Sequence, residues 1–370
     1  MTMLRARLGA MTILWTAAAA RPMVVDSQRG ERLFESEGCI QCHSIAGKGG
    51  KLAPDLGKRI DRNYSPAQLA SVMWNHAPVM WSAMEKQGIR KSGLDEQAAA
   101  DLFAYFYAAR FFDKPGDAAR GKRLFAAKHC SECHGITTSK ADADGARPVI
   151  RWDALGHPIL LAEAMWNHAA NMREAFTRHK ISWPSISGQD LTDMLVYFRN
   201  LPATRQGGFR LETSAGDTGA ALFKAKGCAG CHTGKLDLRP RLKGKTLTDI
   251  AADMWNHAPK MAQPPPRLDP GEMRPIVSYL WTESIFQDNG SVGEGRKVFT
   301  AKNCAVCHDD PASGAPSLAG RKGGFSTVSM ISTLWRHGPQ MLKQMEAKQL
   351  EWPQFHARQM SDLITYLNAK

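Results

Sequence analysis

After its first twenty residues, the 370-residue chain has no hydrophobic run that approaches the length of a membrane-spanning helix. It also has no cysteine outside one repeated pattern, because all eight cysteines lie in four pentapeptides of the form Cys-x-x-Cys-His. A disulfide framework, a zinc site or a thioredoxin-like pair would not need a histidine after every second cysteine. These absences weigh against a membrane-embedded chain and against the structural roles of cysteine.

Cys-x-x-Cys-His is the attachment signature of a c-type haem. Each thiol adds across a haem vinyl group to form a thioether, and the adjacent imidazole becomes the proximal iron ligand. The sequence therefore predicts four covalently bound haem c groups. The predicted attachment cysteines are Cys39, Cys42, Cys130, Cys133, Cys228, Cys231, Cys304 and Cys307, and the predicted proximal ligands are His43, His134, His232 and His308.

The N-terminus has the composition of a secretory signal peptide. Arg5 and Arg7 form a basic region, an apolar stretch follows, and three alanines ending at Ala20 offer a cleavage site. We therefore predict a signal peptide over residues 1–20 and a periplasmic or secreted protein, which fits haem attachment outside the cytoplasmic membrane. An uncleaved membrane anchor is the alternative interpretation of this stretch.

Basic residues outnumber acidic ones, with a formal net charge of +13. Cleavage at Ala20 would remove two arginines and leave 46 basic and 35 acidic residues, a net charge of +11. The propionates of four haems would offset most of this excess, so the charge does not indicate nucleic-acid binding. It favours redox donor and acceptor proteins with acidic surfaces, or association with an anionic membrane surface.

Alignment on the pentapeptides reveals a repeat of about 75–95 residues. A Gly-x-x-x-Phe helix precedes each pentapeptide, and an apolar helix with a tyrosine ends each repeat. We expect the aromatic residues to pack these two helices together. The predicted domains, called segments 1 to 4 below, are residues 26–112, 117–203, 215–286 and 291–370, separated by polar, glycine-rich linkers.

A second signature, Trp-x-His-x-x-x-Met, occurs once in each segment and offers two candidates for the sixth iron ligand. The methionines are Met80, Met172, Met261 and Met341, and the histidines are His76, His168, His257 and His337. A separation of four residues would place both on one face of an unbroken helix, so spacing alone does not choose. Pro78, Pro259 and Pro339 predict that the helix stops near the histidine and that the methionine lies beyond it. We expect the tryptophans to pack on the haem edge.

This order of motifs resembles the class I cytochrome c family over nearly all of the chain after the signal peptide. The resemblance implies an all-α fold of four tandem small helical domains, each built around one covalent haem. It implies His/Met ligation by the four methionines, and bis-histidine ligation is the alternative. It also implies a proline loop whose carbonyl accepts a hydrogen bond from the proximal imidazole. Pro54, Pro240 and Pro316 match that loop, and Pro148 matches it more loosely.

Four irons with both axial positions filled favour outer-sphere electron transfer over catalysis. The predicted function is an exported tetrahaem electron carrier that is not an enzyme. The alternatives are a cytochrome subunit of a dehydrogenase, a subunit of an extracellular haem filament, and a haem peroxidase or small-molecule reductase. The enzyme alternative would need a segment without its distal ligand, and none of the four lacks one.

Overall fold

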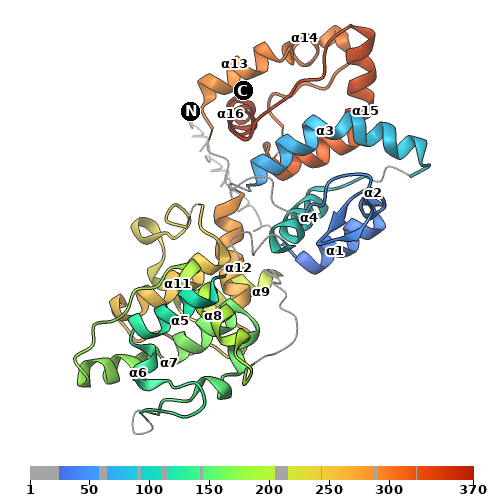
Figure 1. Ribbon diagram of the computed structural model, residues 1–370. Helices are drawn as coiled ribbons and strands as arrows, with labels where there is room; N and C mark the ends of the chain where they lie inside the picture. The colour runs from blue at the N-terminus through green and yellow to red at the C-terminus, as the bar shows by residue number, and fades with distance from the viewer. Residues whose placement is uncertain are drawn as a thin grey trace, which may run out of the picture.

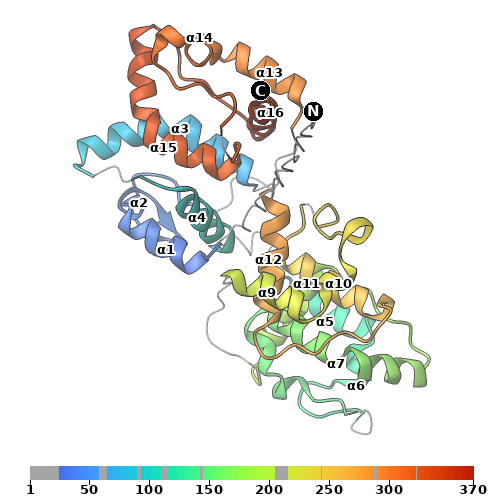
Figure 2. The ribbon, with the colours of Figure 1, turned by 180° about the vertical axis from the view of Figure 1, so that it is seen from behind.

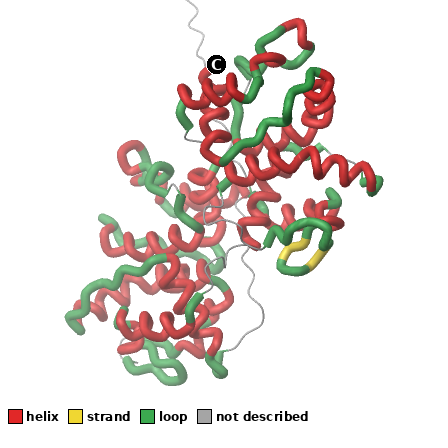
Figure 3. Tube along the Cα trace, turned by 45° about the horizontal axis from the view of Figure 1, so that its top comes forward, coloured by secondary structure: helices red, strands yellow, loops and turns green. Residues whose placement is uncertain are grey.

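The structure is a computed structural model that describes residues 25–57, 65–89, 93–109, 116–141, 145–204, 216–242, 244–286, 290–321 and 323–370. The predicted signal peptide with its cleavage site at Ala20 lies outside these ranges, as do most residues of the predicted linkers. The described residues are mainly helical (Figure 3), with one antiparallel pair of strands, β1 (Ser44–Ile45) and β2 (Lys48–Gly49). The predicted all-α class is confirmed.

Each segment contributes a first helix, a short cysteine helix, a long middle helix and a last helix (Figure 1). In segment 1 these are α1 (Ser27–Ser36), α2 (Cys39–Cys42), α3 (Pro66–Lys86) and α4 (Glu96–Ala109). In segment 2 they are α5 (Ala118–Ala127), α6 (Cys130–Cys133), α7 (Pro158–Arg178) and α8 (Gly188–Asn200), with 3₁₀ helices η2 (Val149–Arg151) and η3 (Asp153–Gly156). In segment 3 they are α9 (Gly216–Ala225), α10 (Cys228–Cys231), α11 (Leu247–His257) and α12 (Met273–Ile285), with η4 (Gly234–Leu236) and η5 (Ala258–Lys260). In segment 4 they are α13 (Val292–Ala301), α14 (Ala305–His308), α15 (Thr327–Ala347) and α16 (Ala357–Ala369), with η6 (Pro311–Ser313).

The first and last helices of each segment cross at the glycine of the Gly-x-x-x-Phe pattern. A Cβ atom at Gly30 would lie 2.1 Å from the backbone oxygen of Asp101 on α4, so only glycine permits this approach. The phenylalanine one turn later packs against the tyrosine of the last helix in all four segments, with ring centroids 5.4–6.4 Å apart. The expected helix packing by these aromatic residues is therefore confirmed.

The segments pack in two pairs that do not follow chain order. Helix α7 of segment 2 packs against α11 of segment 3, and α3 of segment 1 packs against α15 of segment 4. Figures 1 and 2, which view the molecule from opposite sides, both show α3 and α15 side by side. The first and last segments of the chain are therefore direct partners.

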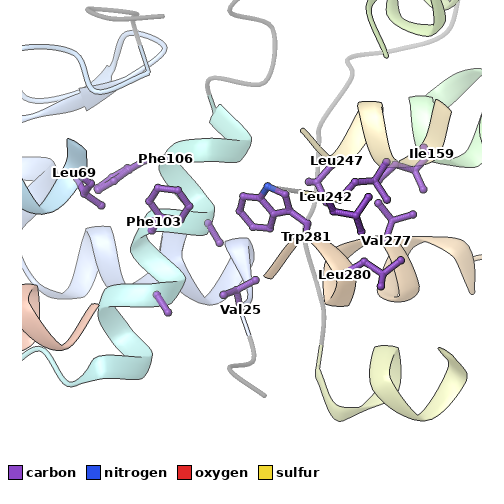
Figure 4. Packing of buried hydrophobic residues seen from close by; sticks show 14 of the residues in the cluster. Val25, Leu69, Phe103, Phe106, Ile159, Leu242, Leu247, Val277, Leu280 and Trp281 are labelled. Carbon is purple, nitrogen blue, oxygen red and sulfur yellow. The ribbon is translucent and has the colours of Figure 1, made fainter. Parts of the chain in front are cut away.

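The two pairs meet at an aromatic contact between α4 of segment 1 and α12 of segment 3. Trp281 is fully buried, and its ring lies 4.5 Å from that of Tyr107 and 5.9 Å from that of Phe103. Figure 4 shows Trp281 between Phe103 on one side and Leu247 on the other. The backbone N–H of Leu247 also donates to the Tyr107 hydroxyl (3.3 Å). Most of the described buried apolar residues therefore form one continuous core across both pairs, and Ala77, Trp81 and Leu334 form a second, smaller cluster between segments 1 and 4.

The middle helices differ from the expectation that proline ends them near the histidine. Helix α3 runs through Pro78 to Lys86, and α15 runs through Pro339 to Ala347. The prediction is wrong for these two helices, because each proline is tolerated within a helix that packs on its partner. Helix α11 does end at His257, and η5, which contains Pro259, follows it.

Candidate haem sites

The two cysteines of each pentapeptide lie on a short helical turn that follows the first helix. In segment 2, His129 has φ +63°, which turns the chain from α5 into α6, and glycines take this place in segments 1 and 3. Burial raises the pKa of the Cys39 thiol to about 12 and that of Cys130 to about 11. Surroundings that disfavour a thiolate suit the uncharged sulfur of a thioether. All eight cysteines are free of disulfides.

The histidine after each second cysteine has its Nδ1 within hydrogen-bonding distance of a backbone oxygen. The distances are 2.9 Å from His43 to Pro54, 2.9 Å from His134 to Arg147, 3.3 Å from His232 to Leu236 and 2.9 Å from His308 to Pro316. Because a carbonyl can only accept, Nδ1 carries the proton and Nε2 keeps its lone pair. This is the tautomer that an Nε2 metal ligand requires.

The expected proline loop is present in two segments and altered in the others. The carbonyls of Pro54 and Pro316 accept from the proximal imidazole as predicted. In segment 2 the acceptor is Arg147, the residue before Pro148. In segment 3 the prediction of Pro240 is wrong, because η4 brings Leu236 to His232 instead. The chain after the third pentapeptide therefore turns earlier than in the other segments.

Segment 2 contains a cavity of about 280 Å³ that brings the predicted site residues together. Cys130, Cys133 and His134 line it from α6, and His168 and Met172 line it from α7. Burial lowers the pKa of His134, which keeps its imidazole neutral, as a metal ligand must be. An apolar cavity with two thiols, a free Nε2 and two opposing donors fits a covalently held haem.

In segments 1, 2 and 4 both candidate distal residues lie on the middle helix, one turn apart, whereas in segment 3 the helix ends at His257 and Met261 lies beyond it. Each of the four methionines is half-buried, and each of the four histidines is exposed. The Nδ1 of His76 donates to the carbonyl of Val72 (2.8 Å), and that of His168 donates to Ala164 (2.7 Å). These bonds hold the two imidazoles along their own helix and leave each Nε2 available.

The signature tryptophans lie at the interfaces between paired segments, where sequence reasoning did not place them. Trp255 of segment 3 stacks on Trp183 of segment 2 at 4.1 Å and donates from Nε1 to the Pro184 carbonyl (2.8 Å). It also lines the cavity of segment 2. Trp74 of segment 1 stacks on Trp352 of segment 4 at 5.4 Å. These contacts join both tryptophans to the neighbouring segment, and packing of the signature tryptophans on the haem edge stays a prediction.

In segments 1 to 3 an asparagine follows the signature tryptophan, and no role for it was predicted from the sequence. The Asn256 side chain accepts from the backbone N–H of Ile186 (2.9 Å) and donates to its carbonyl (2.7 Å). Asn167 makes the same two bonds with Leu268, and Asn75 makes them with Phe355. Each asparagine thus pairs with the backbone of the partner segment. The available signals were asparagine between the tryptophan and the histidine of Trp-x-His in three segments, and Trp-Pro in segments 2 and 4.

Comparisons with known proteins identify the class of domain. The family model "Cytochrome c" matches residues 27–107 and 118–202. The model "Cytochrome C oxidase, cbb3-type, subunit III" matches residues 290–367. The comparisons support a multi-domain c-type cytochrome. Such domains imply covalently bound haem c and point to electron transfer.

One curated relative is the "Cbb3-type cytochrome c oxidase subunit FixPc" of Rhizobium leguminosarum bv. viciae. It is 27% identical over 237 residues, which cover 52% of this chain and 81% of the relative. No solved structure matches the chain significantly. No helix among the described residues is long and apolar enough to cross a membrane.

Proposed function

We propose that the chain is an exported tetrahaem cytochrome that carries electrons between redox partners and is not itself an enzyme, with each of segments 1 to 4 a domain for one haem. The observation that carries this is the recurrence, in all four segments, of two cysteines beside an imidazole whose Nδ1 is held by a backbone carbonyl. A bound haem supplies an iron that changes by one electron between its ferric and ferrous states.

Met80, Met172 and Met341 are the distal ligands that we propose in segments 1, 2 and 4, opposite His43, His134 and His308. Their thioethers are soft donors that favour ferrous iron and raise the reduction potential. The hydrogen bonds that hold His76 and His168 along their helices favour the methionine one turn later. The Nε2 atoms of these histidines remain available, so bis-histidine ligation is the alternative that spectroscopy must exclude.

The packing of the segments indicates which sites exchange electrons. Trp255 lies on the helix that ends at His257 in segment 3, yet its ring forms part of the wall of the cavity in segment 2. Close packing through one shared side chain favours exchange between the sites of segments 2 and 3. The stacked Trp74 and Trp352 similarly join segments 1 and 4. We therefore propose that electrons pass within these pairs, and between pairs at Trp281.

A second candidate function is supported by the matches to cbb3-type oxidase subunits. The segment 4 match and the FixPc relative favour a cytochrome that delivers electrons to a terminal oxidase as a subunit or close partner. The net positive charge favours partners with acidic surfaces in either case. Rates of reduction and oxidation by such a partner should fall as salt is added, because salt screens the attraction.

Redox titration with optical and electron paramagnetic resonance spectra tests the carrier function. The full chain should accept one electron per haem, remain low-spin in the ferric state and bind no carbon monoxide when reduced. Carbon monoxide binding or high-spin ferric signals in the unaltered protein would contradict a carrier with filled axial positions and would favour a catalytic site.

A further inference from the structure

In segment 3 the ring of the proximal histidine lies close to the ring of the histidine of the second signature. The rings of His232 and His257 have centroids 5.8 Å apart, with an angle of 55° between the ring planes. All eight histidines of the four segments' signatures are described, and no comparable ring contact joins His43 to His76 or His308 to His337. We propose that His257, rather than Met261, is the second axial ligand in segment 3. This rests on the proposed haem-binding function.

The separation of the two rings suits two imidazoles bound to one metal ion. A metal–imidazole nitrogen bond is about 2.0 Å, so two rings on opposite sides of one metal have centroids about 6 Å apart. The observed 5.8 Å is close to that value. His232 donates from Nδ1 to Leu236, which leaves its Nε2 for the metal. The separation of the rings therefore allows both imidazoles to bind one iron.

The local backbone explains why segment 3 differs. Helices α3, α7 and α15 continue beyond their methionines, which keeps histidine and methionine on one helical face. Helix α11 ends at His257, and Met261 follows η5 in an extended conformation (φ −71°, ψ 139°). Met261 therefore no longer follows His257 by one turn of the same α-helix.

The chain after Met261 is hydrogen-bonded to segment 2. The Pro266 carbonyl accepts from Trp166 Nε1 (2.8 Å), and the Leu268 backbone pairs with the Asn167 side chain. Three consecutive prolines, ending at Pro266, stiffen this connection. Docking on segment 2 thus fixes the path of the loop that carries Met261. Among the described residues, neither His257 nor His337 makes the bond to the carbonyl four residues earlier that holds His76 and His168, and of the two only His257 contacts its proximal histidine.

Ligation by two imidazoles has a measurable consequence. Methionine raises the potential of a haem relative to histidine, so the haem of segment 3 should have the lowest potential of the four. It should also contribute nothing to the far-red absorption band that marks a methionine–iron bond. The wild-type band should then correspond to three haems per chain.

The test uses two pairs of variants in the full-length, haem-loaded protein. H257A should give one high-spin ferric haem that binds carbon monoxide on reduction, whereas M261A should leave the ferric spectrum and all four potentials unchanged. The matched pair in segment 1 should behave oppositely: M80A should remove one of the three contributions to the far-red band, and H76A should remove none.

The opposite behaviour in segment 3, with loss of a band contribution in M261A and an unchanged spectrum in H257A, would overturn the assignment. The wild-type protein gives an independent answer if a variant does not fold. A far-red band equivalent to four haems would also overturn it. Failure of the haem-binding function is distinguishable, because mass spectrometry would then find no haem on Cys228 and Cys231.

Discussion

Segments 2 and 3 form one pair, and segments 1 and 4 form the other. The two pairs share one kind of contact between their segments and differ in a second. In the shared contact, a Trp-Pro loop of one segment supplies a tryptophan that stacks on the signature tryptophan of the other. Trp183 stacks on Trp255, and Trp352 stacks on Trp74. The adjacent asparagine then pairs with the backbone three residues after the stacked tryptophan. The same local chemistry therefore joins neighbours in the chain and its two ends.

The second contact is made by the hydrogen bonds of an asparagine in one pair and by the packing of an aromatic side chain in the other. Asn167 pairs with Leu268, so segments 2 and 3 clamp each other reciprocally. In segment 4 this asparagine is replaced by the exposed Arg336. Segments 1 and 4 instead bury Trp81 of α3 against Gly338 of α15, where a Cβ would lie 2.2 Å from the indole ring. The second contact is therefore a pair of directional hydrogen bonds between segments 2 and 3 and a close fit of shapes between segments 1 and 4.

The largest expected effect comes from removing one haem attachment site. The C304A/C307A variant should leave segment 4 without its haem and unfolded, because so small a domain depends on its haem for a core. If pairing governs stability, segment 1 should also become sensitive to protease, while segments 2 and 3 stay resistant. Limited proteolysis with mass spectrometry measures this. Damage to segment 3 instead of segment 1 would show that chain order matters more than pairing.

Loss of Trp81 should weaken only the pair of segments 1 and 4. W81A should cost about 3–5 kcal/mol, as large-to-small changes in buried aromatic residues do. The control is R173A, since Arg173 occupies the corresponding, exposed place in segment 2. G338A should cost about 1–3 kcal/mol through overpacking. In the W81A background it should become slightly stabilising, because alanine is the better helix former. Denaturant unfolding of the wild type, W81A, G338A and the double variant decides this. If G338A costs the same with and without Trp81, the contact is contradicted.

Removal of the asparagine clamps should have intermediate effects that depend on the pair. Each of N167A and N256A should cost about 2 kcal/mol, since two hydrogen bonds to buried backbone groups are lost. N75A should cost a similar amount in the other pair. R336N should raise the free energy of unfolding by about 1 kcal/mol through hydrogen bonds with the backbone of Leu94. Leu94 is the buried residue that precedes the last helix of segment 1, as Ile186, Leu268 and Phe355 do in their segments. Thermal unfolding of these variants would reveal whether the clamp can be transferred, and destabilisation by R336N would show that it cannot.

Acid should weaken segment 2 more than the others by a small amount. The N–H of Ile159 donates to His157 Nδ1 at the start of α7, and burial lowers the pKa of His157 from 6.5 to about 4. A depressed pKa contributes stability above pH 6.5 that is lost as pH falls toward 4, about 2 kcal/mol of it between pH 7 and pH 5. Ser65 and Ser326 cap α3 and α15 and do not titrate. H157N should keep the cap and remove the pH dependence, which unfolding curves at both pH values would measure.

The sequence was sufficient for features that repeat within a segment. The Gly-x-x-x-Phe pattern predicted a first helix before each pentapeptide, and the aromatic residues predicted the packing of the first and last helices. Both depend on residues close in the chain or on a contact made identically four times. The all-α class was implied by the resemblance to the class I cytochrome c family, and the structure agrees with it.

The contacts between segments could not be predicted in this way. No sequence pattern indicates that Trp74 contacts Trp352. Which segments pair depends on how whole helix faces fit together, as Trp81 fits on Gly338. The same reasoning explains the proline error. Pro78 and Pro339 suggested helix ends, but packing between α3 and α15 stabilises both helices beyond them. Tertiary packing thus outweighed a local preference.

The central claim, four similar sites that each hold one covalent haem, is tested most directly by the intact mass of the denatured protein. Covalent haems remain attached under these conditions, so the account predicts the mass of the polypeptide plus four haems, and digestion should place one on each of the four cysteine pairs. A mature chain that carries three or fewer haems would contradict the account.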